Sequence, residues 1–316
     1  MVSVHLESGH VDVRDIPPPA RPVGFALIRL LCAGICNTDL ELQRGYYGFA
    51  GTPGHEFVGE VIEADSREWV GRRVAGEINL ACGTCATCAA GMGRHCPTRT
   101  VLGIIRHPGA FQELFTLPEC NLRAVPDSVA TEHAVFTEPL AAACEILDQV
   151  AIPPGAPVAV LGDGKLGLLI AQTLLAHGCG VVHFGRHAKK LQISERAGAR
   201  VEVTTALPAA AFDWVVDATG SSSGLDEAIR MTRPRGTVVM KSTVHGPVSF
   251  DAAAAIVKEI SLVGSRCGRF EPALELLKAG RIDVESMISD RMPLSRAPEA
   301  FARANERGAL KVLLKP

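Results

Sequence analysis

Four cysteines stand close together at C-x2-C-x2-C-x7-C, as Cys82, Cys85, Cys88 and Cys96. Short glycine-containing turns can bring four thiolates around one soft divalent ion, and Zn²⁺ is the usual occupant of such a tetrahedron. Four protein ligands leave no position open for a substrate. The spacing therefore predicts a structural zinc site in a lobe spanning residues 82–96.

Two other interpretations of these cysteines remain open. Disulfides are one, but six of the ten cysteines lie elsewhere without regular spacing, and the chain does not start with a charged segment followed by an apolar one. An iron–sulfur cluster is the other, because Cys96 is followed by Pro97 as in ferredoxin sequences, although the last interval is longer here. A zinc site in a reducing compartment agrees best with the pattern.

A second group of metal-competent residues lies upstream. Cys36 in Cys36-Asn37-Thr38-Asp39, and His55 and Glu56 after Gly54, offer sulfur, nitrogen and oxygen donors that zinc accepts. Taken singly, an isolated cysteine is usually a small buried hydrophobe and an isolated Gly-His is usually a turn. The order of the motifs along the chain favours a metal site.

A glycine-rich loop points to a dinucleotide. Gly162-Asp163-Gly164-Lys165-Leu166-Gly167 fits G-x-G-x-x-G between an expected strand at 157–161 and an expected helix at 165–177. In this context the glycines allow a tight turn, close approach to a pyrophosphate and close helix–strand packing, with the helix N-terminus facing the phosphates. We therefore expect a nicotinamide cofactor here, rather than glycines needed for packing alone.

The end of the next strand should discriminate between NAD and NADP. NAD-binding proteins carry an acidic residue there, whereas this chain has Gly185-Arg186-His187, and Arg186 offers a planar fork of donors suited to a 2′-phosphate. NADP is the preferred prediction, with a merely solvated Arg186 as the alternative. The nicotinamide is expected near Thr219 and Gly220, at the end of the fourth strand.

Around these residues the chain changes texture. At 316 residues it is long enough for about two domains. The first third has short β-type runs at 26–32, 57–62 and 73–78 between turns, whereas strands and helices alternate after residue 155, which predicts a parallel sheet covered on both faces. The run 310–315 is a short strand that can return to the first domain's sheet.

Composition excludes some partners. The formal net charge is −2 and no long basic run occurs, so nucleic acid and anionic membranes are not expected. The longest apolar stretch, residues 166–176, is about half of what crosses a bilayer, and predicts a buried helix. We expect a soluble, cytoplasmic protein.

Together these motifs resemble the zinc-dependent medium-chain dehydrogenase/reductase family, which includes alcohol, sorbitol, glucose and threonine dehydrogenases, over almost the whole chain. The resemblance implies an α/β protein with a GroES-like, mostly β catalytic domain and a Rossmann doubly wound parallel sheet. The implied division is 1–139 for the catalytic domain, 140–265 for the Rossmann domain and 266–316 for the return to the catalytic domain.

The resemblance also implies a site. Cys36 and His55 match the family's ligands of a catalytic zinc, and Glu138, in Thr137-Glu138-Pro139-Leu140-Ala141, matches the third ligand, bound directly or through water. Glu56 then binds the metal when Glu138 is displaced or lies just outside the ligands, and Thr38 is placed to pass the substrate's proton outward.

Two further features of the family frame these expectations. Asp39 is expected behind His55, and Glu41 stands where members often carry a proton-relay histidine. Dimers and tetramers are common in the family, which makes a homodimer or homotetramer the expected assembly.

The implied activity is hydride transfer between an alcohol or polyol and NAD(P)⁺, forming an aldehyde or ketone, with one catalytic and one structural zinc. One alternative is a quinone-type reductase on the same fold. Another is a nucleotide sensor without catalysis, whose cysteine lobe serves redox chemistry or interaction.

Overall fold

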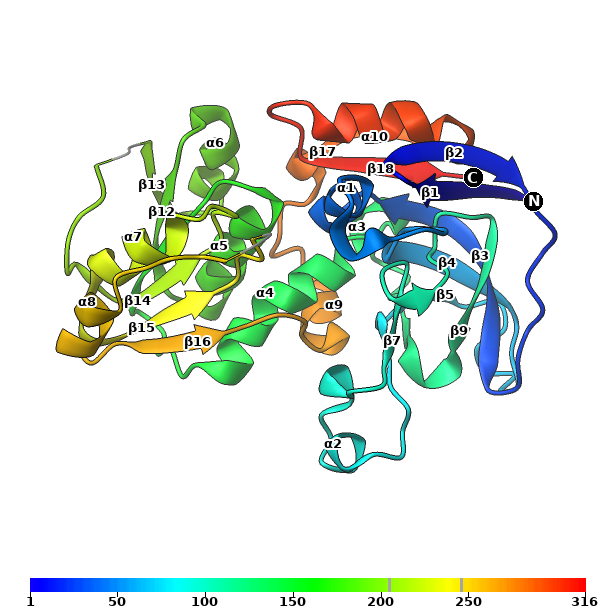
Figure 1. Ribbon diagram of the computed structural model, residues 1–316, viewed down its shortest axis with the longest axis horizontal. Helices are drawn as coiled ribbons and strands as arrows, with labels where there is room; N and C mark the ends of the chain where they lie inside the picture. The colour runs from blue at the N-terminus through cyan, green and yellow to red at the C-terminus, as the bar shows by residue number, and fades with distance from the viewer. Residues whose placement is uncertain (204–205, 245–246) are drawn as a thin grey trace. The chain divides into compact units, whose positions relative to one another are not determined.

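The computed structural model describes residues 1–203, 206–244 and 247–316, and the chain divides into two compact units (Figure 1). The first unit consists of Met1–Glu138, Ala273–Lys278 and Ile288–Pro316. The second consists of Pro139–Pro272 and Ala279–Met287. The return to the first unit therefore starts at Ala273, later than the expected residue 266.

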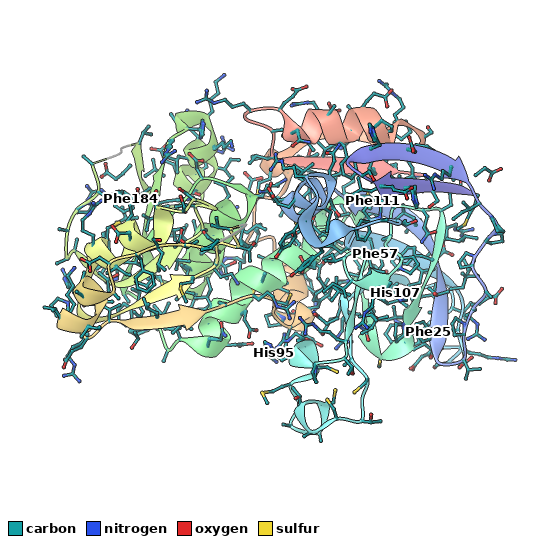
Figure 2. All side chains as sticks on the ribbon, in the orientation of Figure 1. Phe25, Phe57, His95, His107, Phe111 and Phe184 are labelled. Carbon is teal, nitrogen blue, oxygen red and sulfur yellow. The ribbon has the colours of Figure 1, made fainter. Side chains whose placement is uncertain are left out.

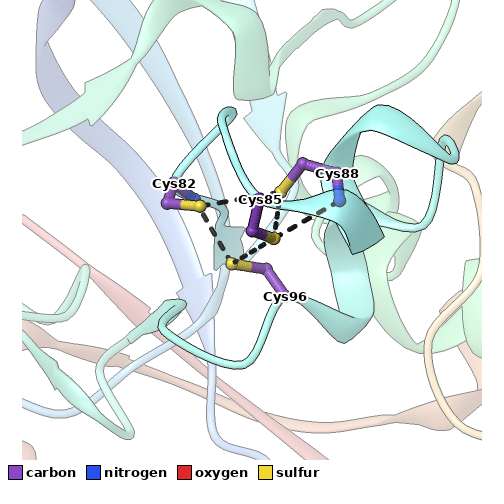
Figure 3. A group of neighbouring side chains, drawn as sticks. All are labelled: Cys82, Cys85, Cys88 and Cys96. Carbon is purple, nitrogen blue, oxygen red and sulfur yellow. Dashed lines mark hydrogen bonds between the residues drawn. The ribbon is translucent and has the colours of Figure 1, made fainter.

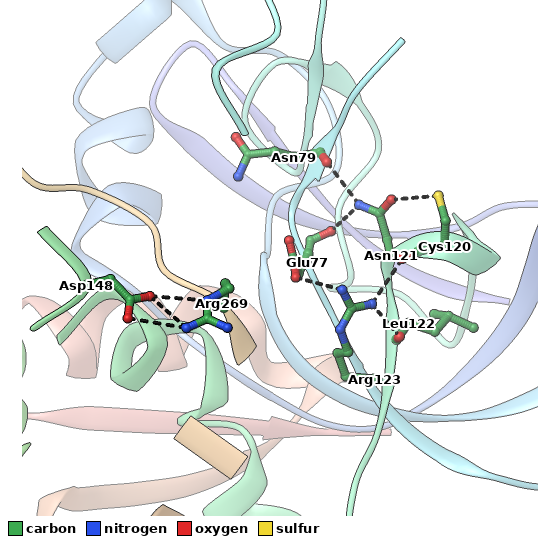
Figure 4. A network of polar contacts seen from close by, with 8 residues as sticks. All are labelled: Glu77, Asn79, Cys120, Asn121, Leu122, Arg123, Asp148 and Arg269. Carbon is green, nitrogen blue, oxygen red and sulfur yellow. Dashed lines mark hydrogen bonds and ion pairs between the residues drawn. The ribbon is translucent and has the colours of Figure 1, made fainter. Parts of the chain in front are cut away.

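Contacts inside the second unit explain this later boundary. The guanidinium of Arg269 donates to both carboxylate oxygens of Asp148 at 3.2–3.3 Å (Figure 4), and the ammonium of Lys241 donates to the carbonyl of Arg266 at 2.9 Å. Residues 266–269 are thus held by the elements that precede them, and the pattern of apolar residues carries no sign of these polar contacts.

The first unit is built mainly from strands. Its largest sheet has the order β10-β5-β4-β3-β18-β17, with β9 pairing β3, and smaller sheets are formed by β1 with β2 and by β6, β7 and β8. The bounds are β1 Val2–Glu7, β2 His10–Asp15, β3 Phe25–Gly34, β4 Glu56–Glu63, β5 Arg73–Gly76, β6 Asn79–Leu80, β7 Thr100–Leu102, β8 Arg106–His107, β9 Leu114–Pro118, β10 Leu122–Ala124, β17 Ile288–Pro293 and β18 Lys311–Lys315.

The last strand returns to the sheet of the first unit, as its sequence predicts. Leu313 and Leu314 of β18 pair antiparallel with β3, while β17 pairs parallel on the other side. Residues 311–314 of β18 are all buried, as expected of a strand paired on both sides and covered on both faces, which explains its run of apolar residues. Two residues of the unit's core, Phe57 and Phe111, are labelled in Figure 2; Phe57 meets Phe115 edge to face at 4.8 Å.

Short helices complete the first unit. They are α1 Asn37–Gln43, α2 Ala86–Ala89, α3 Thr131–Ala134 and α10 Ala297–Asn305. Two longer helices have residues in both units: α4 Thr137–Gln149 and α9 Phe270–Lys278.

The second unit contains a six-stranded parallel sheet in the order β13-β12-β11-β14-β15-β16. Numbered along the chain, this is the 3-2-1-4-5-6 order of the dinucleotide-binding fold, whose ligands bind where the strand order reverses. The strands are β11 Pro157–Leu161, β12 Gly180–Gly185, β13 Arg200–Val203, β14 Phe212–Asp217, β15 Thr232–Met240 and β16 Ser261–Gly264. The predicted parallel sheet is confirmed.

Helices connect these strands. They are α5 Lys165–His177, α6 Ala188–Arg196, α7 Gly224–Met231 and α8 Ala252–Val257. The bounds of α5 are those expected from the sequence, because a glycine precedes it and Gly178, at φ +99°, ends it in the left-handed conformation. Within the described residues no helix is long and apolar enough to span a bilayer.

Candidate metal centres and cofactor site

The four cysteines of the lobe converge (Figure 3). Sulfur–sulfur distances are 3.5 Å for Cys85–Cys88, 3.9 Å for Cys82–Cys88 and 3.9 Å for Cys85–Cys96. A tetrahedron with Zn–S bonds of about 2.3 Å has edges of about 3.8 Å, so the thiols already have the spacing of a ZnS4 site. All ten cysteines are free thiols, which removes the disulfide interpretation.

The electrostatics of the lobe also favour a cation. Backbone N–H groups around Thr84 and Cys85 lower the pKa of Cys82 to about 5, whereas desolvation and the neighbouring thiols raise the pKa of Cys88 to about 12. Four sulfurs this close cannot all ionise without a cation among them. A divalent ion supplies that charge, and the donor set fits zinc.

The base of the lobe is held by a buried amide. Asn121 donates to the carbonyls of Glu77 at 2.6 Å and Asn79 at 3.0 Å (Figure 4), and it lies 7% exposed. Arg123 adds an ion pair to Glu77 at 3.0 Å. The segment that leads into Cys82 is therefore fixed independently of any metal.

A second cluster forms around the upstream residues. Cys36, His55 and Glu56 each offer a donor atom within 4.8 Å of the other two, although they come from two segments about twenty residues apart. His55 is 3% exposed and Glu56 1% exposed, while Cys36 is partly exposed. The structure thus brings together three of the predicted ligands.

Asp39 joins the two segments that carry this cluster. Its carboxylate, 0% exposed, accepts the backbone N–H of Cys36 at 2.8 Å and that of Gly54 at 3.2 Å. Nδ1 of His55 lies 3.4 Å from the same carboxylate, an ion-pair distance that is too long for a well-formed hydrogen bond. Asp39 therefore lies behind His55, where the family pattern predicts it.

Glu56 is held by a lysine from the end of the chain. Lys311, in β18, is 1% exposed; its ammonium pairs with Oε2 of Glu56 and lies 5.6 Å from the ring centre of Phe136. Burial lowers the pKa of Lys311, but the negative charges of Glu56 and Cys36 outweigh it and raise the pKa above its usual value. Gly34 leaves room for this pair, because a Cβ there would lie 2.9 Å from the lysine side chain.

The cluster fits a metal ion because one of its donor atoms is unused. Oε1 of Glu56 is buried and has no hydrogen-bond partner in the described part of the chain. Burial lowers the pKa of His55, yet the charges of Asp39 and Cys36 raise it well above its usual value. An environment this negative favours a bound cation.

The glycine-rich loop fits a dinucleotide. A Cβ at Gly162, where φ is +106°, would lie 2.5 Å from the carbonyl oxygen of Ala218, and a Cβ at Gly167 would overlap the carbonyl oxygen of Gly162. A Cβ at Gly164 meets nothing within 4 Å. The outer glycines are therefore required by packing, and the middle one opens onto free space at the start of α5, where a pyrophosphate can approach the backbone.

The residues expected near the nicotinamide, Thr219 and Gly220, are held by hydrogen bonds at the end of β14. The hydroxyl of Thr219 donates to Asp217 at 2.7 Å, and the backbone N–H of Gly220 donates to Ser242 at 2.9 Å. Ser242 in turn donates to Asp217 at 3.0 Å. Thr219 and Gly220 thus lie beside β11 at the edge of the sheet that carries the glycine loop.

Comparison with known proteins agrees with both halves of the chain. The alcohol dehydrogenase GroES-like domain family matches residues 23–127, and the zinc-binding dehydrogenase family matches residues 166–279. L-threonine 3-dehydrogenase of Chelativorans sp. (strain BNC1) is 31% identical over 95% of this chain and 93% of its own length. This chain belongs to the zinc-dependent medium-chain dehydrogenase/reductase family.

Further relatives of this dehydrogenase include two that were solved with different nicotinamide cofactors. Sorbitol dehydrogenase of Halalkalibacterium halodurans is 28% identical over 100% of this chain and 98% of its own. A zinc-binding dehydrogenase of Sinorhizobium meliloti 1021, solved with NADP, has a TM-score of 0.91 and 29% identity over 100% and 99% of the two chains. An alcohol dehydrogenase of Escherichia coli CFT073, solved with NADH, has a TM-score of 0.90 and 25% identity over the same shares.

Family membership confirms the predicted fold class and activity. The dehydrogenase transfers hydride between an alcohol or polyol and NAD(P)⁺, with a GroES-like domain and a Rossmann domain. Among the site residues expected from the resemblance, Thr38 accepts a hydrogen bond from the thiol of Cys36 at 3.8 Å, while Glu138, at the first turn of α4, lies outside the group of three mutually close donors. Glu41 pairs with Arg44 at the surface.

The sequence did not reveal two charged residues of these sites. Lys311 stands in an apolar strand, where a lysine usually faces solvent. Asp217 ends a buried strand, and only this position at the carboxyl edge of the sheet, beside Thr219, could have drawn attention to it.

Proposed function

We propose that this dehydrogenase oxidises a hydroxyl of a polyol or a related alcohol, with NADP⁺ as the preferred acceptor. The observation that carries the proposal is the cluster of Cys36, His55 and Glu56, in which Oε1 of Glu56 is buried and left without a partner in the described part of the chain. In a closed structural zinc site every ligand position is filled permanently by protein, whereas a catalytic site keeps a position at which ligands exchange.

The ligand set of the catalytic zinc is part of the proposal. Cys36 and His55 supply two positions, and Glu138 supplies the third, with Glu56 taking its place when Glu138 is displaced. Zinc bound there acts as a Lewis acid on the substrate's oxygen. The four thiols of Cys82, Cys85, Cys88 and Cys96 hold a second, structural zinc.

The chain's own residues prepare this chemistry. Asp39 orients the imidazole of His55 and fixes the backbone of Cys36, so the two donors face the same point. Lys311 pairs with Oε2 of Glu56, which leaves Oε1 available. The hydroxyl of Thr38, beside the thiol of Cys36, is placed to take the proton that the substrate releases.

The cofactor preference rests on Arg186. Its side chain is exposed at the end of β12 and has no ion-pair partner among the described residues. No acidic residue occupies position 185, and Lys189 and Lys190 follow in the first turn of α6. This surplus of positive charge favours the 2′-phosphate that distinguishes NADP.

A panel of polyols, amino alcohols and simple alcohols, assayed with both cofactors, tests the proposal. We expect turnover of at least one polyol or amino alcohol, with a higher kcat/KM for NADP⁺ than for NAD⁺. The substrate class is proposed because relatives named for sorbitol and threonine match nearly the whole chain. Turnover of quinones by NADPH without turnover of any alcohol would contradict it.

The arginine provides the second test. Arg186→Ala should weaken NADP binding about tenfold or more and leave NAD binding within about twofold, because only NADP carries the 2′-phosphate that we propose Arg186 binds. Lys278→Ala, an exposed cation of the first unit, is the control. Equal losses for the two cofactors would remove the NADP preference.

The assembly and the compartment complete the proposal. We infer a homodimer or homotetramer, as is common in the family, which light scattering of the purified protein measures directly. The ten free thiols are consistent with a reducing compartment such as the cytoplasm. A monomer at micromolar concentration would contradict the inferred assembly.

A further inference from the structure

The second residue of the glycine-rich loop is bonded to the turn that follows the next strand. Oδ2 of Asp163 accepts the backbone N–H of Arg186 at 2.7 Å and that of His187 at 2.7 Å. Nδ1 of His187 lies 3.1 Å from both carboxylate oxygens. One carboxylate thus binds two successive peptide groups and one ring of the same turn.

Asp163 is nearly buried. The residue is 9% exposed, and burial, which raises the pKa of its carboxyl, is outweighed by the hydrogen bonds from His187 and Arg186, which lower it. The acceptors that a carboxylate offers are therefore engaged by the protein itself. Asp163 is bonded to this turn and stands in the glycine-rich loop, whereas the acidic residue that receives the adenosine ribose hydroxyls in NAD-binding proteins of this fold stands at the strand end.

The glycine that ends β12 belongs to the same arrangement. A Cβ at Gly185 would lie 2.7 Å from both Cβ and Oδ2 of Asp163. An acidic residue at position 185 and the present position of Asp163 therefore exclude each other. The chain has placed its carboxylate in the loop, pointing at the backbone of the turn, instead of at the strand end, pointing at a ribose.

The consequence falls on Arg186. Its peptide N–H is fixed by Asp163, while its guanidinium is exposed and free of ion pairs among the described residues. The next residue, His187, is the N-cap of α6 and makes no side-chain cap bond to the helix, because its ring turns to Asp163 instead. The side chain of His187 therefore caps none of the first N–H groups of α6, which follow directly after Arg186 in the chain.

We propose that Asp163 is a positioning residue for cofactor specificity: together with His187 it holds the turn of residues 185–187 so that Arg186 and the start of α6 face the 2′-phosphate of NADP. This inference rests on the proposed preference for NADP. Asp163 should then strengthen the binding of the 2′-phosphate, although its negative charge, taken alone, would weaken it.

The sign of the effect makes the test decisive. Asp163→Asn removes the charge and offers only one oxygen acceptor, so it should loosen the turn. His187→Ala keeps the carboxylate of Asp163 and the hydrogen bonds it accepts from the two backbone N–H groups, and removes only the imidazole ring. The control is Asp213→Asn, an exposed carboxylate at the start of β14 in the same unit, which carries the same change of charge.

The probes are adenosine 2′,5′-bisphosphate and adenosine 5′-phosphate, which differ only by the 2′-phosphate, and calorimetry measures their dissociation constants. We expect Asp163→Asn to weaken the bisphosphate about tenfold or more and the monophosphate less than about twofold, with a smaller loss of the same kind in His187→Ala. Asp213→Asn should change neither. Thermal melting of each variant checks that it is folded.

The other outcomes are distinct. Tighter binding of the bisphosphate by Asp163→Asn, or equal loss of both probes, would overturn the positioning role while the NADP preference stands. Wild-type protein that binds both probes equally would overturn the preference and the positioning role together. If Asp163→Asn does not fold, an unchanged ratio of the two constants in His187→Ala contradicts the inference.

Discussion

Two clusters of metal-binding side chains in the same unit are built in opposite ways. The lobe gathers four identical donors from fifteen consecutive residues, three of them at least partly exposed. The second cluster, here called the reactive cluster, consists of the thiol of Cys36, the imidazole of His55 and the carboxylate of Glu56, which come from two segments. Lys311, more than 250 residues further along the chain, is buried and pairs with Glu56. Four ligands that fill every position of a zinc ion can come from one short segment. A site that leaves one position of the metal open for substrate needs the fold to hold fewer ligands, from separate segments, in place.

The largest expected effect comes from the buried lysine. Lys311→Met leaves the charge of Glu56 without its partner in a site from which water is excluded, and should lower the free energy of unfolding by about 3–5 kcal/mol. Urea denaturation of the apo protein measures it. Lys311 pairs with Glu56 and with none of the four cysteines of the lobe, so the substitution should leave the lobe's zinc in place.

Two variants accompany that measurement. Lys278→Met, an exposed partner of Glu275, should cost no more than about 0.5 kcal/mol. Adding Glu56→Gln to Lys311→Met should recover a large part of the stability, because the unpaired charge is then gone. A loss below about 1 kcal/mol in Lys311→Met would mean that Glu56 and Lys311 do not form a buried pair.

The next largest effect is a loss of zinc affinity at the reactive cluster alone. Asp39→Asn weakens the support of His55 and Cys36 and should lower the zinc affinity of the reactive site about 10–100-fold. Competition with a chelator measures it site by site. The lobe should release its zinc at the same chelator concentration as in the wild type, and a parallel loss from both sites would argue that Asp39 acts through overall stability.

The base of the lobe should respond more weakly. Asn121→Ala leaves the carbonyls of Glu77 and Asn79 without this donor, which should cost about 1–2 kcal/mol. Limited proteolysis should then cut within 82–96 earlier than in the wild type, while the reactive site keeps its zinc. If the cleavage pattern stays unchanged, the lobe does not depend on this amide.

The smallest effect is a pH dependence near the lobe. Burial lowers the pKa of His107, whose Nε2 donates to the carbonyl of Thr116 at 3.2 Å. The unfolded chain then binds a proton more readily, so this contribution to stability is present above about pH 6.5 and is lost as the pH falls below it. The slope should stay below about 1 kcal/mol per pH unit, since the ring is only partly buried.

His107→Phe removes that slope. The new ring can keep the stacking on Phe25, whose centre lies 6.4 Å from that of His107 (Figure 2). Unfolding free energies between pH 7 and pH 5 should therefore be flatter in the variant. An identical slope in both proteins would assign the pH dependence to other groups.

The comparison also explains what the sequence could predict. The lobe, the glycine-rich loop and the bounds of α5 were predictable because each depends on spacing within a short segment. The roles of Lys311 and Asp163 were not, because each depends on a partner brought near by tertiary structure. A lysine in a strand and a variable position in G-x-G-x-x-G carry no pattern of their own.

The boundary between the units shows the same limit. Composition changes near residue 265, yet Arg269 binds Asp148 and Lys241 binds the carbonyl of Arg266, which keeps this segment in the second unit. Polar contacts between side chains far apart in the chain leave no periodic signal. Hydrophobic periodicity therefore located the elements better than it located the limits of the units.

The central claim is that one cluster carries the chemistry and the other stabilises the structure. The zinc content and turnover of two matched variants test it most directly. Wild-type protein should hold two zinc ions per chain. Cys36→Ser should keep the lobe's zinc and its stability while turnover falls at least about a hundredfold, and Cys88→Ser should lose the lobe's zinc and stability while folded molecules retain most of their turnover. Full activity in Cys36→Ser, or inactivity of fully folded Cys88→Ser, would contradict the assignment of chemistry to one cluster and structure to the other.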